Sequence, residues 1–202
     1  MLTLKAQPDA KKLLPERLHR YLTERIVVSG WYPERDYWIL IETLTKVLDP
    51  KVVGADPWRF FARFSAQNDI GGSNAAASAS VKAASAGVYR TYAAAGAQDP
   101  QGFFRRAEKI WSQYHDTGSL VVIGGHVKTN SLVMRLMGFH IPLDGFVRLQ
   151  GYYLEEFGAL VGLPLSAKVT RSTAKRDPFC EWEITLERSE RTEAYVASLP
   201  PL

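Results

Sequence analysis

Few residues of this chain could carry out chemistry, and they lie far apart. Four histidines and one cysteine occur in 202 residues. His115 stands beside Asp116 where a helical pattern ends, so it is either a ligand or acid/base residue or part of a surface turn. We favour the turn, because neighbours in a chain need not point into one site. His126 and His140 lie near the ends of expected strands, where we favour structural roles.

Cys180 is expected on the apolar side of a strand, together with Trp182 and Ile184. A small buried hydrophobic residue is the favoured interpretation, since a reactive thiolate needs exposure and nearby positive charge. Lys175 and Arg176 are close in sequence and keep a redox or acylation role open. One thiolate cannot supply a structural zinc site, so we expect no metal.

Other catalytic patterns are also missing from the sequence. Glu155 and Glu156 are adjacent on an expected helix, which is poor geometry for a pair of carboxylates. The chain contains no phosphate loop, nucleophile elbow or dinucleotide fingerprint. We therefore expect a protein that is not an enzyme, with no catalytic residues and no cofactor.

The elements that must position these residues are clearest in the C-terminal half. A helix is predicted from an apolar stripe at spacings of three and four, and Gly162 and Pro164 end it. The stripe is Phe146, Leu149, Tyr153, Phe157 and Leu160. Two strands follow, in which Ala167 and Val169, then Cys180, Trp182, Ile184 and Leu186, alternate with polar residues. A connector of four to six residues should join them, with Asp177 and Pro178 setting the turn.

The N-terminal part predicts helices. Patterns over 15–28 and 34–48, and starts at Asp56-Pro57 and Asp99-Pro100, indicate four of them. The second should bury Tyr37, Leu40, Ile41, Leu44 and Leu48. Strands are expected at 120–123 and 132–137. The fold class is therefore α+β, a helical layer packed on a four-stranded antiparallel sheet with the order β-β-α-β-β in the C-terminal half.

Length favours a single domain over 1–188. From Glu187 onward glutamate and arginine alternate, so residues 189–202 should form a solvated tail or a partner-docking peptide. The alanine- and serine-rich run 71–96 has three interpretations. It is a tightly packed central helix, which we favour, a ligand-accommodating or lid segment, or a poorly ordered one.

Composition bounds the function further. The net charge is +4, and the first 25 residues carry six basic against three acidic side chains. No basic stripe with aromatic or helix-turn-helix context accompanies this charge, so nucleic acid is not expected as a partner. One cysteine suits a reducing compartment, and no apolar run is long enough for a signal peptide or a membrane span. We expect a cytoplasmic protein.

One stretch resembles a known family. Its residues are Gly151-Tyr152, Gly162 and Ala174-Lys175-Arg176-Asp177-Pro178-Phe179-Cys180-Glu181-Trp182-Glu183. They look like the signature of the 4-vinyl reductase family of small-molecule-binding domains, which ends in a strand pair joined by a Gly-Asp-Pro-x-Cys turn. Trp31-Tyr32-Pro33 and Tyr114-His115-Asp116-Thr117-Gly118 also look like landmarks of bacterial relatives.

The resemblance implies a fold and a function class. The family is similar in fold to haem nitric-oxide-binding domains and to one class of vesicle transport-particle subunits. Members that hold zinc use several cysteines, whereas Ser172 stands at an expected cysteine position here, and Arg176 replaces the usual glycine. The Tyr-x-Ser-x-Arg pattern of haem-binding relatives is also absent. We therefore expect neither zinc nor haem.

Five tryptophans, nine tyrosines and nine phenylalanines favour a pocket. We predict a sensory or regulatory domain that binds a small apolar or aromatic molecule between the helices and the sheet. The candidate ligand-binding residues are Trp111, Tyr114, Tyr152, Tyr153, Phe157 and Trp182, above Leu136 and Ile184 of the sheet. The alternative is a structural interaction module in which the same aromatic residues fill the core. In either case we expect a homodimer or a protein partner, because related folds pair.

Overall fold

The computed structural model describes residues 2–25, 32–69, 99–141 and 143–202. These residues form two compact units, 1–60 and 61–202. The alanine- and serine-rich run 71–96 lies outside the described residues, as does Trp31.

The first unit consists of short helices and one longer helix. Their bounds are α1 Leu2–Lys5, α2 Ala10–Leu13, the 3-10 helix η1 Glu16–Leu18, α3 Arg20–Thr23, α4 Glu34–Val47 and α5 Pro50–Val53. The single helix predicted over 15–28 is thus divided into η1 and α3, and its last residues lie outside the described part. Asp36 of α4 is buried, accepts a hydrogen bond from the Tyr21 hydroxyl at 3.0 Å and forms an ion pair with Arg17.

Helix α4 confirms the predicted element, and Leu40 and Leu44 are buried as predicted, but Tyr37 is not. Tyr37 is 47% exposed, whereas Trp38, which was not predicted on the buried face, is 3% exposed. The bonds of Asp36 account for this difference, because they hold the side of α4 that carries Asp36 and Thr43 toward the interior. Hydrophobic spacing alone does not register a carboxylate that is buried with its partners.

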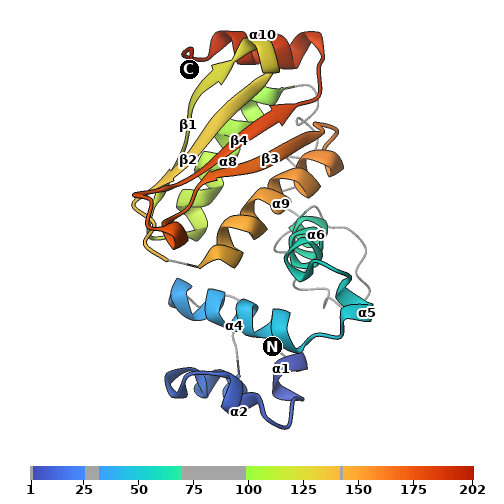
Figure 1. Cartoon of the computed structure of the whole chain (residues 1–202), viewed down its shortest axis with the longest axis vertical. Coiled ribbons are helices and arrows are strands. Elements are labelled where there is room, and N and C mark those ends of the chain that lie inside the picture. Colours follow the sequence, from blue (N-terminus) through green and yellow to red (C-terminus); the bar gives the residue numbers. More distant parts are fainter. Residues whose placement is uncertain (1, 26–31, 70–98, 142) are drawn as a thin grey trace. The chain divides into compact units, whose positions relative to one another are not determined.

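The second unit contains a four-stranded antiparallel sheet with the order β1-β2-β4-β3. The strands are β1 Ser119–His126, β2 Ser131–Met137, β3 Leu165–Arg171 and β4 Cys180–Leu186. Helix α8, Pro100–Tyr114, precedes β1, and helix α9, Asp144–Leu160, connects β2 to β3. Figure 1 shows both helices against the same face of the sheet. The predicted α+β order is confirmed.

The side of the sheet that faces the helices carries the core. In the pairing of β2 with β4, Met134 lies opposite Trp182 and Leu136 opposite Cys180, and all four side chains are buried. The predicted alternation of β4 is therefore confirmed. The Trp182 indole Nε1 donates to the carbonyl of Val147 in α9 at 3.0 Å. Gly151 lies over this indole, since a Cβ there would be 3.4 Å from it.

Helix α6, Pro57–Asp69, begins at the predicted Asp56-Pro57 signal. Asp56 caps it, as its Oδ1 accepts from the Trp58 amide at 3.0 Å. Asp99 caps α8 in the same way through the Gly102 amide, at 2.7 Å. From Phe61 onward, α6 belongs to the second unit. Two of its side chains reach α9, as described below.

The connector between β3 and β4, residues 172–179, is longer than predicted and contains the 3-10 helix η3, Thr173–Lys175. Asp177 sets the turn as expected, because its Oδ2 accepts from the Ser172 amide at 2.8 Å. Arg176 has a φ of 68°, in the left-handed region. This is the position at which the 4-vinyl reductase signature has glycine, the residue that adopts this conformation without strain.

On each outer strand of the sheet, one backbone amide is bound by a glutamate from a helix. The Glu108 carboxylate of α8 accepts from the Val122 amide of β1 at 2.9 Å. The Glu155 carboxylate of α9 accepts from the Ala167 amide of β3 at 2.9 Å. Unpaired strand amides are templates for association with other chains, so these two carboxylates protect the edges of the sheet.

Residues 189–202 do not form the solvated tail that the sequence predicted. Residues Glu190–Ser198 form helix α10, which begins with a capping box between Ser189 and Thr192 and buries Tyr195 and Val196. The chain then pairs with β1, because the Gly125 amide donates to the carbonyl of Pro200 at 2.9 Å. A Cβ on Gly124 would lie 2.5 Å from that same carbonyl oxygen. The glycine pair therefore leaves room for the end of the chain.

Candidate functional site

Trp111, the first predicted ligand-binding residue, is part of the packed core. It is 5% exposed, and its indole Nε1 donates to the carbonyl of Thr117 at 3.0 Å. The His115 ring stacks on it, with centroids 3.7 Å apart, and Phe139 meets it edge-on at 5.5 Å. His115 therefore covers one face of a core tryptophan and extends the ring packing at the end of α8.

The remaining predicted residues are not gathered into one wall. Trp182 is 1% exposed and is committed to the Val147 carbonyl. Tyr152 is half-buried on α9, next in sequence to Tyr153. The side chain of Tyr114 lies outside the described residues, although its backbone ends α8. Of the predicted group, the structure brings together Tyr153 and Phe157.

These two residues form a cluster with Phe103 and Asp69, which we call the Tyr153 cluster. The rings of Tyr153 and Phe157 stack with centroids 5.6 Å apart, and Phe103 of α8 lies 5.9 Å from Phe157. The Tyr153 hydroxyl donates to Asp69 Oδ2 of α6 at 2.7 Å. Three helices thus contribute to one aromatic wall that has a carboxyl group at its margin.

The environment of Asp69 changes its acidity. Burial raises the pKa of this carboxyl to about 6, and the hydrogen bond from Tyr153 opposes the shift only in part. Desolvation acts in this direction because an apolar surrounding disfavours the charged form. Perturbed carboxyl groups of this kind gather at functional sites, which makes the cluster a candidate.

A second contact between α6 and α9 lies close to the first along both helices. Arg63 binds Glu156 with two hydrogen bonds, from Nε at 3.1 Å and from Nη2 at 3.2 Å. This geometry matches the planar guanidinium to the carboxylate. The neighbouring Glu155 turns to the amide of Ala167 instead. The two adjacent glutamates therefore diverge, as the sequence predicted.

Asp69 was not predicted as a site residue. Its partner on α9 follows 84 residues later in the chain, and it lies at the end of α6 in a polar run with no motif. The aromatic stripe of α9 predicted Tyr153 and Phe157. Nothing local predicted the carboxyl that meets them.

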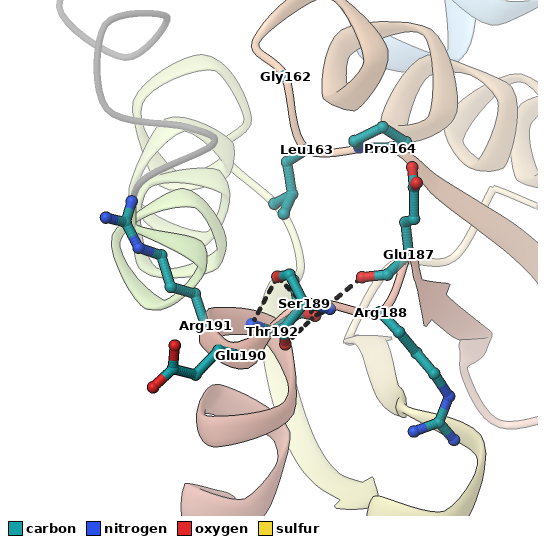
Figure 2. A pocket seen from close by; sticks show the side chains of 9 residues that line it. All are labelled: Gly162, Leu163, Pro164, Glu187, Arg188, Ser189, Glu190, Arg191 and Thr192. Carbon is teal, nitrogen blue, oxygen red and sulfur yellow. Dashed lines mark hydrogen bonds between the residues drawn. The ribbon is translucent and has the colours of Figure 1, made fainter.

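A pocket of about 520 Å³ lies elsewhere, where the end of α9 meets the start of α10. Figure 2 shows its lining, which comes from residues 162–164 and 187–192. Ser189 and Thr192 are hydrogen-bonded to each other, and the Thr192 hydroxyl donates to the carbonyl of Glu187. Arg188 points away, to Glu193 and to the carbonyl of Lys128. Ligand sites are usually more apolar than this, and none of the predicted residues line it.

The described residues offer little evidence of a metal site or of a reactive thiol. Among the residues described, no group of three or more histidine, cysteine, aspartate or glutamate side chains is placed to hold a metal ion. Cys180 is fully buried, with its Sγ 3.4 Å from the Thr173 hydroxyl. Within the same residues, no helix is long and apolar enough to cross a membrane.

No protein-family model matches the chain, and neither does any curated protein. Among solved structures, this chain is similar to an H-NOX protein from S. oneidensis in the Fe(II)NO ligation state. The two superpose with a TM-score of 0.50 and share 10% sequence identity, and the match covers 89% of this chain and 91% of the H-NOX chain. A trafficking protein particle complex subunit 3 from Naegleria fowleri, covalently bound to palmitic acid, has a TM-score of 0.47 at 7% identity, over 75% and 90%. The first likeness shows a shared fold.

Proposed function

We propose that the chain is a non-catalytic sensory or regulatory domain of the cytoplasm that binds a small apolar or aromatic molecule at the Tyr153 cluster. The observation that carries this proposal is the 2.7 Å hydrogen bond between Tyr153 and Asp69 beside two buried phenylalanine rings. Small-molecule sites are mostly apolar and hold a few placed polar groups, and this cluster has that composition.

Two further observations support a ligand at this position. The sequence predicts Tyr153 and Phe157 on one face of a helix, and Asp69 of α6 meets this face through the Tyr153 hydroxyl. The resemblance to the 4-vinyl reductase family points to the same class of small-molecule-binding domain. Haem is not part of the proposal, because the Tyr-x-Ser-x-Arg pattern is missing and His115 lies flat against Trp111.

A structural interaction module is the second candidate, and the packing around Trp111 favours it. The Phe139 and Phe146 rings lie 4.4 Å apart and both contact the Trp111 ring, so this part of the predicted wall is a filled core. Dense packing is the rule in protein interiors. Under this candidate the chain acts as a dimerising scaffold without a ligand.

A thermal-shift screen of small aromatic compounds distinguishes the two candidates. A compound present at about a hundred times its dissociation constant should add about 2.7 kcal/mol to the free energy of unfolding. We expect at least one compound to raise the melting temperature of the wild-type protein. A screen in which no compound does so would replace the sensory proposal with the interaction module.

Oligomeric state is the companion measurement. We propose a homodimer in either case, and light scattering at micromolar concentration measures it. A species of 22.6 kDa, the mass of one chain, would contradict the dimer. It would also count against the dimerising scaffold.

A further inference from the structure

We infer that the ligand of the Tyr153 cluster carries a protonated amine or another ammonium group, which pairs with the Asp69 carboxylate and lies against the aromatic rings of the cluster. This inference rests on the proposed function and names the class of ligand. It follows from three observations about the carboxyl, its neighbouring cation and the rings.

The first observation concerns the partners of Asp69. The Tyr153 hydroxyl donates to Oδ2. Among the residues that the structure describes, no lysine, arginine or histidine forms an ion pair with Asp69. Asp69 is half-buried, and a carboxylate withdrawn from water needs a counter-charge or several donors, so a single hydroxyl satisfies only part of that need. A cation brought by the ligand would complete the site.

The second observation concerns Arg63, a cation on the same helix. Both of its hydrogen bonds go to Glu156, at 3.1 and 3.2 Å. The bidentate geometry directs the guanidinium toward Glu156 of α9, so Arg63 does not serve as the counter-charge of Asp69. The carboxyl at the end of α6 is therefore left to other donors, although a basic side chain lies less than two helical turns before it.

The third observation concerns the rings. Tyr153 and Phe157 stack on each other, Phe103 lies next to Phe157, and both phenylalanines are buried. The faces of aromatic rings attract cations, and sites built from such rings recognise ammonium groups. An anionic ligand would be repelled by the carboxylate. A neutral ligand would leave the carboxylate without a counter-charge.

The test compares ligands that share a ring and differ in charge. Naphthylmethylamine, naphthylmethanol and naphthoate form one series, and the corresponding benzyl and indolyl compounds form two more. Isothermal titration of the full chain at about pH 8 keeps both the amine and the Asp69 carboxyl charged. We expect the amine to bind wild-type protein at least tenfold more tightly than the alcohol, and the carboxylate to bind weakest.

Variants assign the preference to one residue. Asp69→Asn keeps the shape of the side chain and removes the charge, so the amine and the alcohol should bind this variant with nearly equal affinity. Glu190→Gln removes one exposed carboxylate on α10 and is the matched control, in which the preference should be unchanged. The wild-type comparison alone keeps the test decisive if the Asp69 variant does not fold.

The outcomes separate this inference from the proposed function. If the alcohols bind as tightly as the amines, or if Asp69→Asn keeps the preference, the inference is wrong while the ligand-binding proposal stands. If no compound of the three series binds and the wider screen also fails, the proposed function falls and the inference falls with it.

Discussion

The hydroxyl of Tyr153 lies 2.7 Å from the carboxyl of Asp69, so one hydrogen bond joins α6 to α9 across 84 residues of sequence. Tyr153 belongs to the aromatic stripe of α9, where its ring stacks on Phe157, and Phe157 in turn lies next to Phe103. This pair adds a hydrogen-bonding group with a fixed direction to a cluster that otherwise consists of aromatic rings.

The pH dependence of stability should report Asp69. Its pKa in the folded protein is raised to about 6 from 3.8, so the protonated form is favoured by folding. Asp69 therefore contributes fully to the free energy of unfolding at pH values below its unfolded pKa of 3.8. This contribution is lost as the pH rises through about 6. We expect a loss of about 1–3 kcal/mol over this window.

Denaturant unfolding of the wild-type protein and of Asp69→Asn, at several pH values between about 4 and 8, measures the effect. Asparagine cannot ionise, so the variant should lack this part of the loss, and the difference between the two profiles isolates it from all other groups. Parallel profiles for the two proteins would mean that Asp69 titrates normally.

Glu155 should protect the β3 edge. Replacing it with alanine removes the acceptor at 2.9 Å from the Ala167 amide. We expect the free energy of unfolding to fall by about 1–2 kcal/mol, and hydrogen exchange at Ala167 to become faster. Glu42→Ala is the matched control, since Glu42 forms an exposed ion pair with Lys46 whose loss should cost less than about 0.5 kcal/mol. Unchanged exchange at Ala167 would refute the role of Glu155.

Asp177→Ala should weaken the connector between β3 and β4. Its carboxylate accepts from the Ser172 amide at 2.8 Å, as in other turns stabilised by aspartate. The expected loss is about 0.5–2 kcal/mol, by analogy with capping residues. Urea melts of the two proteins measure it, and equal midpoints would show that η3 holds the turn without Asp177.

Arg176→Gly should stabilise the same turn. Arginine at a φ of 68° carries a cost that glycine avoids, of about 1–2 kcal/mol for left-handed backbone. The unfolded glycine chain is more flexible, which offsets part of the gain, so we expect a net increase of less than about 1 kcal/mol. Arg176→Val is the contrasting variant, because a β-branched residue fits this conformation poorly. A glycine variant less stable than the wild type would contradict the argument.

Local signals predicted much of the fold. Aspartate followed by proline marked the starts of α6 and α8, and the capping bonds of Asp56 and Asp99 are present. The alternation through Cys180 and Trp182 predicted which side of β4 is buried. In these cases the cause of the structure lies within a few residues of the signal.

Other features depend on contacts that the sequence pattern does not contain. Tyr37 was predicted on the buried face of α4 but is exposed, because Asp36 occupies the interior together with its partner Tyr21. Helix α10 was missed because its surface is rich in glutamate and arginine, although Ser189 and Thr192 form a capping box. Only Tyr153 and Phe157 of the predicted wall meet in the cluster. Asp69 completes it through a contact with no local signature.

The binding affinity of Tyr153→Phe, compared with that of Tyr152→Phe, tests the central claim most directly. The two tyrosines are neighbours on α9, and each substitution removes one hydroxyl, but of the two only Tyr153 donates to Asp69. For the best compound of the screen, we expect the dissociation constant to rise about tenfold in Tyr153→Phe, the loss expected for one hydrogen bond to a charged group. We expect a change of less than about twofold in Tyr152→Phe. Equal affinities for the wild-type protein and Tyr153→Phe would contradict a ligand site at this cluster.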